Sequence, residues 1–222
     1  MGITSRRPVY HAGLCRPSAL PVLRLALPLL LVLFAGCAAP PPAAPADRLD
    51  DPALSAALGD LLCRLEPRCG LLRLHVIDNA AEQAHMLADG RLLFSLGLLL
   101  ATDGEDEIAF VLAHELAHRR LRHSPLAAPA QRLPMEIAAD RAARARLIEL
   151  GWRADAGTRL LSRLLERERQ RDADGGALDA SITQLRARLE ALGEPSVVPA
   201  HRPTPPAHDW ATLLGRYRAA TP

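Results

Sequence analysis

The stretch Val111–Pro125, VLAHELAHRRLRHSP, contains the pattern H-E-x-x-H at His114–His118. Residues four positions apart lie on one face of an α-helix, so the imidazoles of His114 and His118 can reach the same metal ion. Glu115 lies beside them, placed to act on a metal-bound water without ligating the metal itself. The neighbouring apolar residues predict a largely buried helix, where two unpaired imidazoles would be costly. The pattern therefore favours a zinc site over a chance pair of surface histidines.

A tetrahedral catalytic zinc takes three protein ligands and leaves one position open. His123 falls one residue short of the place where metzincins carry their third histidine, and Leu121 occupies the glycine position of that pattern. The alternative is Glu136, in the stretch EIAAD on a second predicted helix. Asp140, one turn further on, could accept a hydrogen bond from a ligand histidine and fix its tautomer. The predicted ligands of a single Zn²⁺ are therefore His114, His118 and Glu136.

The surrounding sequence predicts an α+β domain that is mostly helical with a small sheet. The helix of the H-E-x-x-H pattern opens with Thr102 or Asp103 as its cap, and the next helix begins near Pro134 and continues to Gly151. The remaining predicted elements are a helix from Asp51-Pro52, a strand over Leu71–Asp78, a hairpin around Asp89-Gly90, helices over 155–168 and 177–192, and a short helix from Asp209.

The N-terminus is predicted to be a targeting segment. Several arginines precede the apolar run Leu25–Cys37, LALPLLLVLFAGC, which has the length of a signal sequence. Its end, Phe34–Cys37, resembles a bacterial lipobox, which implies cleavage before Cys37 and acylation of that thiol. Ala38 and Ala39 follow, which in a Gram-negative bacterium would favour the outer membrane. The expected location is the periplasmic face of a membrane, although an uncleaved anchor or an ordinary signal peptide is the alternative reading.

These signals divide the chain into four predicted segments and place its cysteines. The segments are a lipoprotein signal peptide (1–36), a Pro/Ala-rich tether (37–50), a peptidase domain (51–195) and a Pro-rich tail (196–222). In an oxidising periplasm, Cys63 and Cys69 are expected to form a disulfide, and their spacing fits no common zinc knuckle. The formal net charge of +2 is too balanced to indicate a nucleic-acid partner.

The sequence resembles the zinc metallopeptidases that include HtpX, BepA and the CAAX prenyl proteases, which are gluzincins of metallopeptidase family 48. The residues that carry this resemblance are ADGRLLFSLGLLL (88–100), EDEIAFVLAHELAHRRLRH (105–123) and EIAADRAARARLIELGWRADAGTRLLSRL (136–164). The resemblance implies a zincin-like fold whose edge strand, over 83–87, flanks the active site. It also points to His201 as a further catalytic residue, but here Arg202 separates that histidine from Pro203.

The resulting functional hypothesis is a zinc-dependent endopeptidase. Zinc would activate a water, Glu115 would act as general base, and an extended polypeptide would add as a strand to residues 83–87. Candidates to support the oxyanion are His201, His208 and Tyr217. By analogy with relatives, the substrates would be unfolded or misfolded cell-envelope proteins. Two alternatives remain: a non-catalytic zinc lipoprotein that acts as a binding or chaperone-like module, and a small-molecule metallohydrolase.

Overall fold

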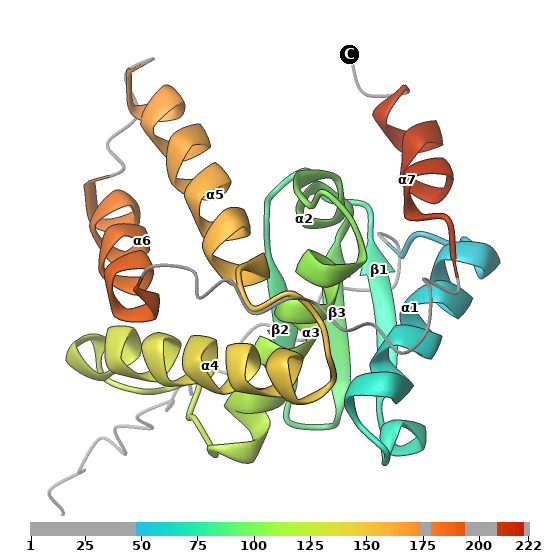
Figure 1. The fold of residues 1–222 in the computed structure, drawn as a ribbon, viewed down its shortest axis with the longest axis horizontal. Helices are drawn as coiled ribbons and strands as arrows, with labels where there is room; N and C mark the ends of the chain where they lie inside the picture. The colour runs from blue at the N-terminus through green and yellow to red at the C-terminus, as the bar shows by residue number, and fades with distance from the viewer. Residues whose placement is uncertain (1–47, 174–178, 194–207, 220–222) are drawn as a thin grey trace, which may run out of the picture. The chain divides into compact units, whose positions relative to one another are not determined.

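The computed structural model describes residues 48–173, 179–193 and 208–219, which belong to one compact unit, Pro42–Pro222. It is mostly helical with one small sheet, so the predicted α+β class is confirmed (Figure 1). The elements are α1 (Pro52–Leu65), the 3₁₀ turn η2 (Cys69–Leu71), β1 (Arg73–Ile77), β2 (Ala84–Met86), β3 (Arg91–Ser95), α2 (Leu96–Ala101), α3 (Glu105–Arg120), α4 (Pro129–Glu149), α5 (Ala156–Ala173), α6 (Asp179–Leu192) and α7 (Trp210–Arg218).

The sheet has the order β1-β3-β2 and mixes two kinds of pairing. β1 runs parallel to β3, with His75 opposite Leu93, whereas β2 runs antiparallel to β3, with His85 opposite the same Leu93. The predicted hairpin is confirmed: β2 and β3 flank the turn at Gly90, whose φ of 84° favours glycine. The antiparallel strand β2 therefore lies at one edge of the sheet.

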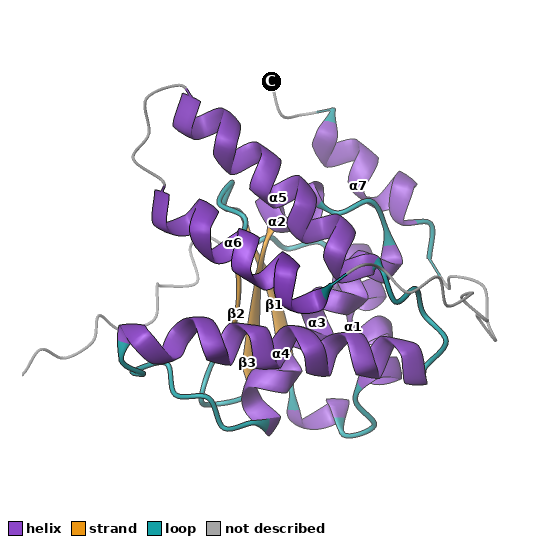
Figure 2. Cartoon of the chain, turned by 60° about the vertical axis from the view of Figure 1, so that its left-hand side comes forward, coloured by secondary structure: helices purple, strands orange, loops and turns teal. Residues whose placement is uncertain are grey.

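Helix α3 is the centre of the fold. It contacts α1, α4, α5 and β2, and nearly all of its residues from Glu105 to Ala117 are buried. Helices α4, α5 and α6 contact one another beside it (Figure 2), while α1 packs against β1 (Figure 1). Buried alanines allow the close approach of α3 and α4, and they are Ala113, Ala117, Ala139 and Ala143. This contact brings the H-E-x-x-H helix against the helix that carries EIAAD.

Two predicted helix starts are wrong. The N-cap of α3 is Gly104 rather than Thr102 or Asp103, because the Thr102 hydroxyl donates to a carbonyl at the end of α2. Helix α4 begins at Pro129, so Pro134 lies inside the helix and not at its start. Proline at the first helical position needs no N–H partner, whereas Pro134 removes one hydrogen bond of the helix, at a turn where Ala130 and Pro134 are exposed.

The short helix α2 was not predicted. It follows β3 directly, and the Ser95 hydroxyl caps it by accepting a hydrogen bond from the N–H of Leu98 at 3.1 Å. The same hydroxyl accepts from the N–H of Gln83 at 3.1 Å, which fixes the start of β2. Gly97 is required here, since a Cβ would lie 2.1 Å from the carbonyl oxygen of Ala80.

The predicted helices that begin at Asp51-Pro52 and at Asp209 are both present, and so is the predicted disulfide. α1 begins as predicted, with Asp51 as its N-cap and Pro52 at its first turn. Asp209 caps α7, whose residues Trp210 and Leu214 are buried in the hydrophobic core, so this helix of the predicted tail packs onto the domain. A disulfide joins Cys63 and Cys69. Among the residues that the structure describes, no helix is long and apolar enough to cross a bilayer.

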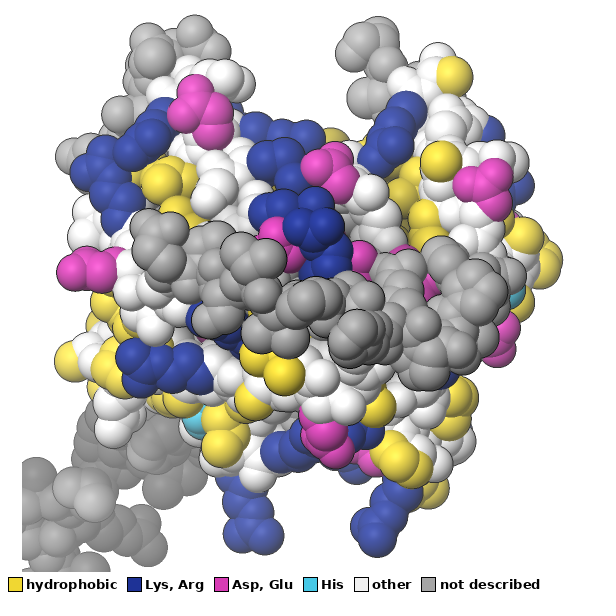
Figure 3. All heavy atoms as spheres, viewed as in Figure 1, with side chains coloured by type: hydrophobic (Ala, Val, Ile, Leu, Met, Phe, Trp, Pro, Cys, Tyr) yellow, Lys and Arg dark blue, Asp and Glu magenta, His cyan; other side chains and the backbone are white. Residues whose placement is uncertain are grey.

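Ion pairs connect α5 to the layer around the sheet. Arg163 pairs with Asp103 at 2.7 Å and also with the buried Glu107, while Arg167 pairs with Glu82 at 2.6 Å. Arginine and acidic side chains are interspersed on the face drawn in Figure 3. These pairs hold α5 against α3 and the loop before β2.

Candidate metal centre

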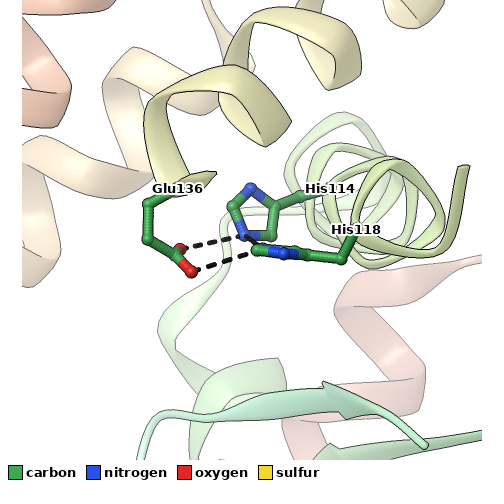
Figure 4. Close-up of side chains that lie close together, drawn as sticks. All are labelled: His114, His118 and Glu136. Carbon is green, nitrogen blue, oxygen red and sulfur yellow. Dashed lines mark hydrogen bonds and ion pairs between the residues drawn. The ribbon is translucent and has the colours of Figure 1, made fainter. Parts of the chain in front are cut away.

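Three predicted ligands converge at the contact between α3 and α4 (Figure 4). The Nε2 atoms of His114 and His118 lie 3.0 Å apart. The carboxylate of Glu136 faces both rings, with Oε2 at 3.2 Å from His114 Nε2 and Oε1 at 3.3 Å from His118 Nε2. α3 presents the two histidines one turn apart, and α4 presents the carboxylate opposite them.

This donor set fits a zinc ion. Two donor atoms that each lie 2.0–2.1 Å from a tetrahedral zinc are about 3.3–3.4 Å from one another. The spacings of 3.0, 3.2 and 3.3 Å among these three side chains are close to that value. In addition, two ring nitrogens that face each other at 3.0 Å require a proton or a cation between them. One ion bound by His114, His118 and Glu136 would meet that requirement.

A second set of residues contacts the far sides of the histidine rings. Asp140, which is 1% exposed, places Oδ1 2.9 Å from Nδ1 of His114, although the pair is not aligned as a good hydrogen bond. His123 places its Nδ1 3.0 Å from Nδ1 of His118. Both contacts leave the Nε2 atoms free to face a metal. The predicted partner Asp140 is thus beside His114, and His123 lies beside the ring of His118.

The position of His123 follows from how α3 ends. Arg122 adopts a left-handed conformation, with φ of 55°, and the N–H of His123 donates to the carbonyl of His118 at 3.0 Å. This is a Schellman-type C-cap, which reverses the chain after the last helical turn. The reversal returns the His123 ring to the helix that it has just left. The contact between the rings of His118 and His123 therefore depends on this C-cap.

Glu115 lies apart from the three converging donors and points toward β2. Its side chain is buried, and Oε2 accepts a hydrogen bond from the N–H of Met86 at 2.8 Å. Burial raises the pKa of the Glu115 carboxyl above its ordinary value, against the opposing effect of the nearby histidines. A carboxylate that is held beside a metal position, and whose affinity for protons is raised, is suited to general-base chemistry.

Nearby carboxylates control the charge of the site when no metal is bound. Burial alone would lower the pKa of His114, but the carboxylates of Asp140 and Glu136 outweigh burial and raise the pKa of His114 from 6.5 to about 9. The same contacts, against the effect of burial, lower the pKa of Glu136. At neutral pH the metal-free centre therefore holds a protonated His114 against two carboxylates.

We expect the metal-free protein to lose stability as pH rises from about 6.5 to about 9. The raised pKa of His114 contributes stability that is fully present below its unfolded value of 6.5 and is lost through about 9. The size is of the order of 1.4 kcal/mol per pKa unit. Urea unfolding of metal-free protein at pH 6 and pH 9 would measure the change, and equal stability at the two pH values would contradict it.

Zinc should remove this pH dependence, because a ligating His114 must be neutral. Zinc binding at pH 7 should therefore release a proton. Calorimetric titrations in two buffers with different ionisation enthalpies would count that proton.

Two other residues that the sequence singled out, His208 and Tyr217, do not lie at this centre. His208 Nε2 lies 2.9 Å from Asp60 of α1, and the hydroxyl of Tyr217 donates to Asp51, the N-cap of the same helix. Both potential supports for the oxyanion are thus placed against α1. His201 and the predicted acylation site Cys37 lie outside the described residues.

Sequence reasoning missed one residue at the centre, Arg188. It reaches the site from α6 and contacts both Asp140 and Glu136. No local pattern in the sequence indicates this, because α6 is separated from α4 by a whole helix and arginine is frequent throughout the chain. The helical pattern of α6 was predicted, but its packing against the EIAAD helix was not.

The residues of this centre lie within the part of the chain that matches a known peptidase family. Residues 73–194, more than half of the 222-residue chain, match the model of Peptidase family M48. Over 51 residues the chain is also 45% identical to the mitochondrial metalloendopeptidase OMA1 of Schizosaccharomyces pombe. That similarity covers 23% of this chain and 15% of the relative, so the chain spans a small part of the relative's length.

Proposed function

Because the chain belongs to peptidase family M48, we propose that it is a zinc-dependent endopeptidase. The observation that carries the proposal is the convergence of His114, His118 and Glu136 on one point, with the buried carboxylate of Glu115 held beside an edge strand. Two histidines and a carboxylate are a known ligand set for catalytic zinc, which leaves the fourth position for water or substrate.

The chemistry follows from the separate roles of the acidic residues. When bound, zinc would supply acidification of a water molecule and polarisation of the scissile carbonyl. Glu115 would accept the proton of the attacking water and later deliver it to the leaving amine. The N–H of Met86 donates to Glu115 Oε2, and this hydrogen bond would keep the carboxylate of the base in place. Asp140 and His123 would keep the two histidine rings in the orientation in which both Nε2 atoms face the metal.

We further propose that β2 binds the substrate as an added strand. The carbonyl of Gln83 and the N–H of Leu87 pair with β3, at 3.0 and 2.7 Å. Because backbone groups alternate along a strand, those of Ala84 and Met86 point away from β3. The N–H of Met86 donates to Glu115 there, so an added strand would pair with the remaining backbone groups of these two residues. An extended polypeptide paired to this edge would lie along the general base. Backbone pairing gives affinity with little sequence preference, which suits unfolded proteins as substrates.

Cleavage of an unfolded protein such as casein tests the proposed activity. Zinc-loaded protein should cleave casein, should stop after removal of the metal by a chelator, and should recover when zinc is restored. The non-catalytic module would bind unfolded protein in all three states without producing fragments. A small-molecule metallohydrolase would give neither fragments nor stable binding. Absence of fragments from fully zinc-loaded protein would therefore refute the endopeptidase.

We also propose that the protein acts as a lipoprotein at the periplasmic face of a bacterial outer membrane, on misfolded envelope proteins. The support is the lipobox-like Phe34–Cys37 and the Pro/Ala-rich stretch that follows it. The expected mature N-terminus is Cys37 with two or three acyl chains. Mass spectrometry of the membrane fraction would detect it, with Cys37→Ser as the control. A soluble chain that begins at another residue would exclude acylation at Cys37.

A further inference from the structure

Arg188 of α6 joins two carboxylates of the metal centre. Its Nε donates to Asp140 Oδ2 and its Nη2 to Asp140 Oδ1, both at 2.8 Å. Its Nη1 lies 3.3 Å from Oε2 of Glu136, the same oxygen that faces His114 Nε2 at 3.2 Å. The planar guanidinium can form this fork with one carboxylate and still reach a second, which an ammonium group cannot do.

The charges of the site explain why this contact is needed. Three buried or half-buried carboxylates, those of Glu115, Glu136 and Asp140, lie around the metal position. When a metal is bound, His114 is neutral and no longer compensates Asp140. Arg188 is then the charge that remains against Asp140, which is 1% exposed and would otherwise be a buried unpaired carboxylate.

From this geometry we propose that Arg188 is a positioning residue for the metal centre. It holds Glu136 in the orientation that ligates the ion, and it holds Asp140 behind His114. This inference rests on the proposed function, because it takes Glu136 and His114 as ligands. Arg188 itself touches neither the metal nor the substrate; it acts through the two carboxylates of α4.

A purely structural role, in which Arg188 only fastens α6 to α4, is performed by other residues. Arg144 of α4 donates to the carbonyl of Leu192 at 2.6 Å, and Arg141 donates to that of Ala191. Both arginines connect the same two helices, at the end of α6. Within the part of the chain that the structure describes, neither arginine forms a hydrogen bond or ion pair with Glu136 or Asp140. Arg144→Met therefore weakens the α4–α6 contact without changing the carboxylates of the centre.

The test compares Arg188→Met, Arg188→Lys and Arg144→Met with wild type. Zinc affinity is measured by competition with a chromophoric chelator, and ligand geometry by the visible absorption of Co²⁺-substituted protein. Loss of a residue that orients metal ligands typically lowers metal affinity about 10–100-fold. We expect a loss of that size and an altered Co²⁺ spectrum for Arg188→Met, partial recovery for Arg188→Lys, and wild-type values for Arg144→Met.

Three outcomes would overturn the inference. The first is an unchanged or tighter zinc Kd in folded Arg188→Met, the second an unchanged Co²⁺ spectrum, and the third an equal loss in Arg144→Met. If Arg188→Met does not fold, the comparison of Arg188→Lys with Arg144→Met decides, since only the former would alter the spectrum. Failure of the proposed function is distinguishable, because wild type itself would then either bind no stoichiometric zinc or bind zinc without cleaving casein.

Discussion

Glu115→Gln is expected to fold and bind zinc as wild type does, yet to lose peptidase activity. Glu115 accepts a hydrogen bond from Met86 and is not one of the three predicted metal ligands. An amide at this position should therefore leave those ligands in place. The amide cannot accept the proton of the attacking water, and loss of a positioned acid–base group typically costs about 10²–10⁴ in rate. Peptide cleavage and zinc content, measured on the same preparation, check this.

Glu149→Gln is a suitable control, because Glu149 is an exposed residue at the end of α4. It should cleave at the wild-type rate. If Glu115→Gln with zinc bound also cleaves at that rate, Glu115 is not the general base. If neither wild type nor variant cleaves while both bind unfolded protein, the binding-module function replaces the enzyme.

His114→Ala is expected to lose the metal and much of the stability that the metal supplies. Zinc would join α3 to α4 through His114 and Glu136, so binding free energy becomes folding free energy. A ligand present at about 100 times its Kd stabilises the folded state by about 2.7 kcal/mol. Urea unfolding should therefore show zinc-loaded wild type to be more stable than His114→Ala by at least an amount of this order.

A chelator provides the matching control for His114→Ala. Removal of zinc should lower the stability of wild type and leave that of the variant unchanged, because the variant has no ion to lose. A variant that retains stoichiometric zinc, or that is destabilised further by the chelator, would remove His114 from the ligand set.

Much of the fold could be predicted because local signals agree with the tertiary structure. Asp51 before Pro52 predicts the start of α1, and Asp89-Gly90 predicts the β2–β3 turn. The predicted start of α4 is wrong because a proline usually marks a helix boundary, and the prediction used Pro134, whereas the helix already begins at Pro129. Helix α2 was missed although Ser95 before an apolar run is itself a capping signal.

The candidate metal centre was predictable to the extent that its residues are close in sequence. His114, Glu115 and His118 share one helix, and EIAAD presents Glu136 and Asp140 one turn apart. The contact of His123 with His118 depends on the left-handed Arg122, which composition does not indicate. Arg188 reaches the centre only through the packing of α6 on α4, a long-range contact that no local pattern encodes.

Anomalous diffraction at the zinc edge, from crystals of zinc-loaded Glu115→Gln, tests the central claim most directly. We expect one zinc per chain, within about 2.0–2.2 Å of the Nε2 atoms of His114 and His118 and of a carboxylate oxygen of Glu136. The amide side chain that replaces the Glu115 carboxylate should lie beside the ion without ligating it. A zinc ion bound elsewhere, ligation through Asp140 or His123 in place of Glu136, or no anomalous peak in zinc-loaded crystals would contradict the account.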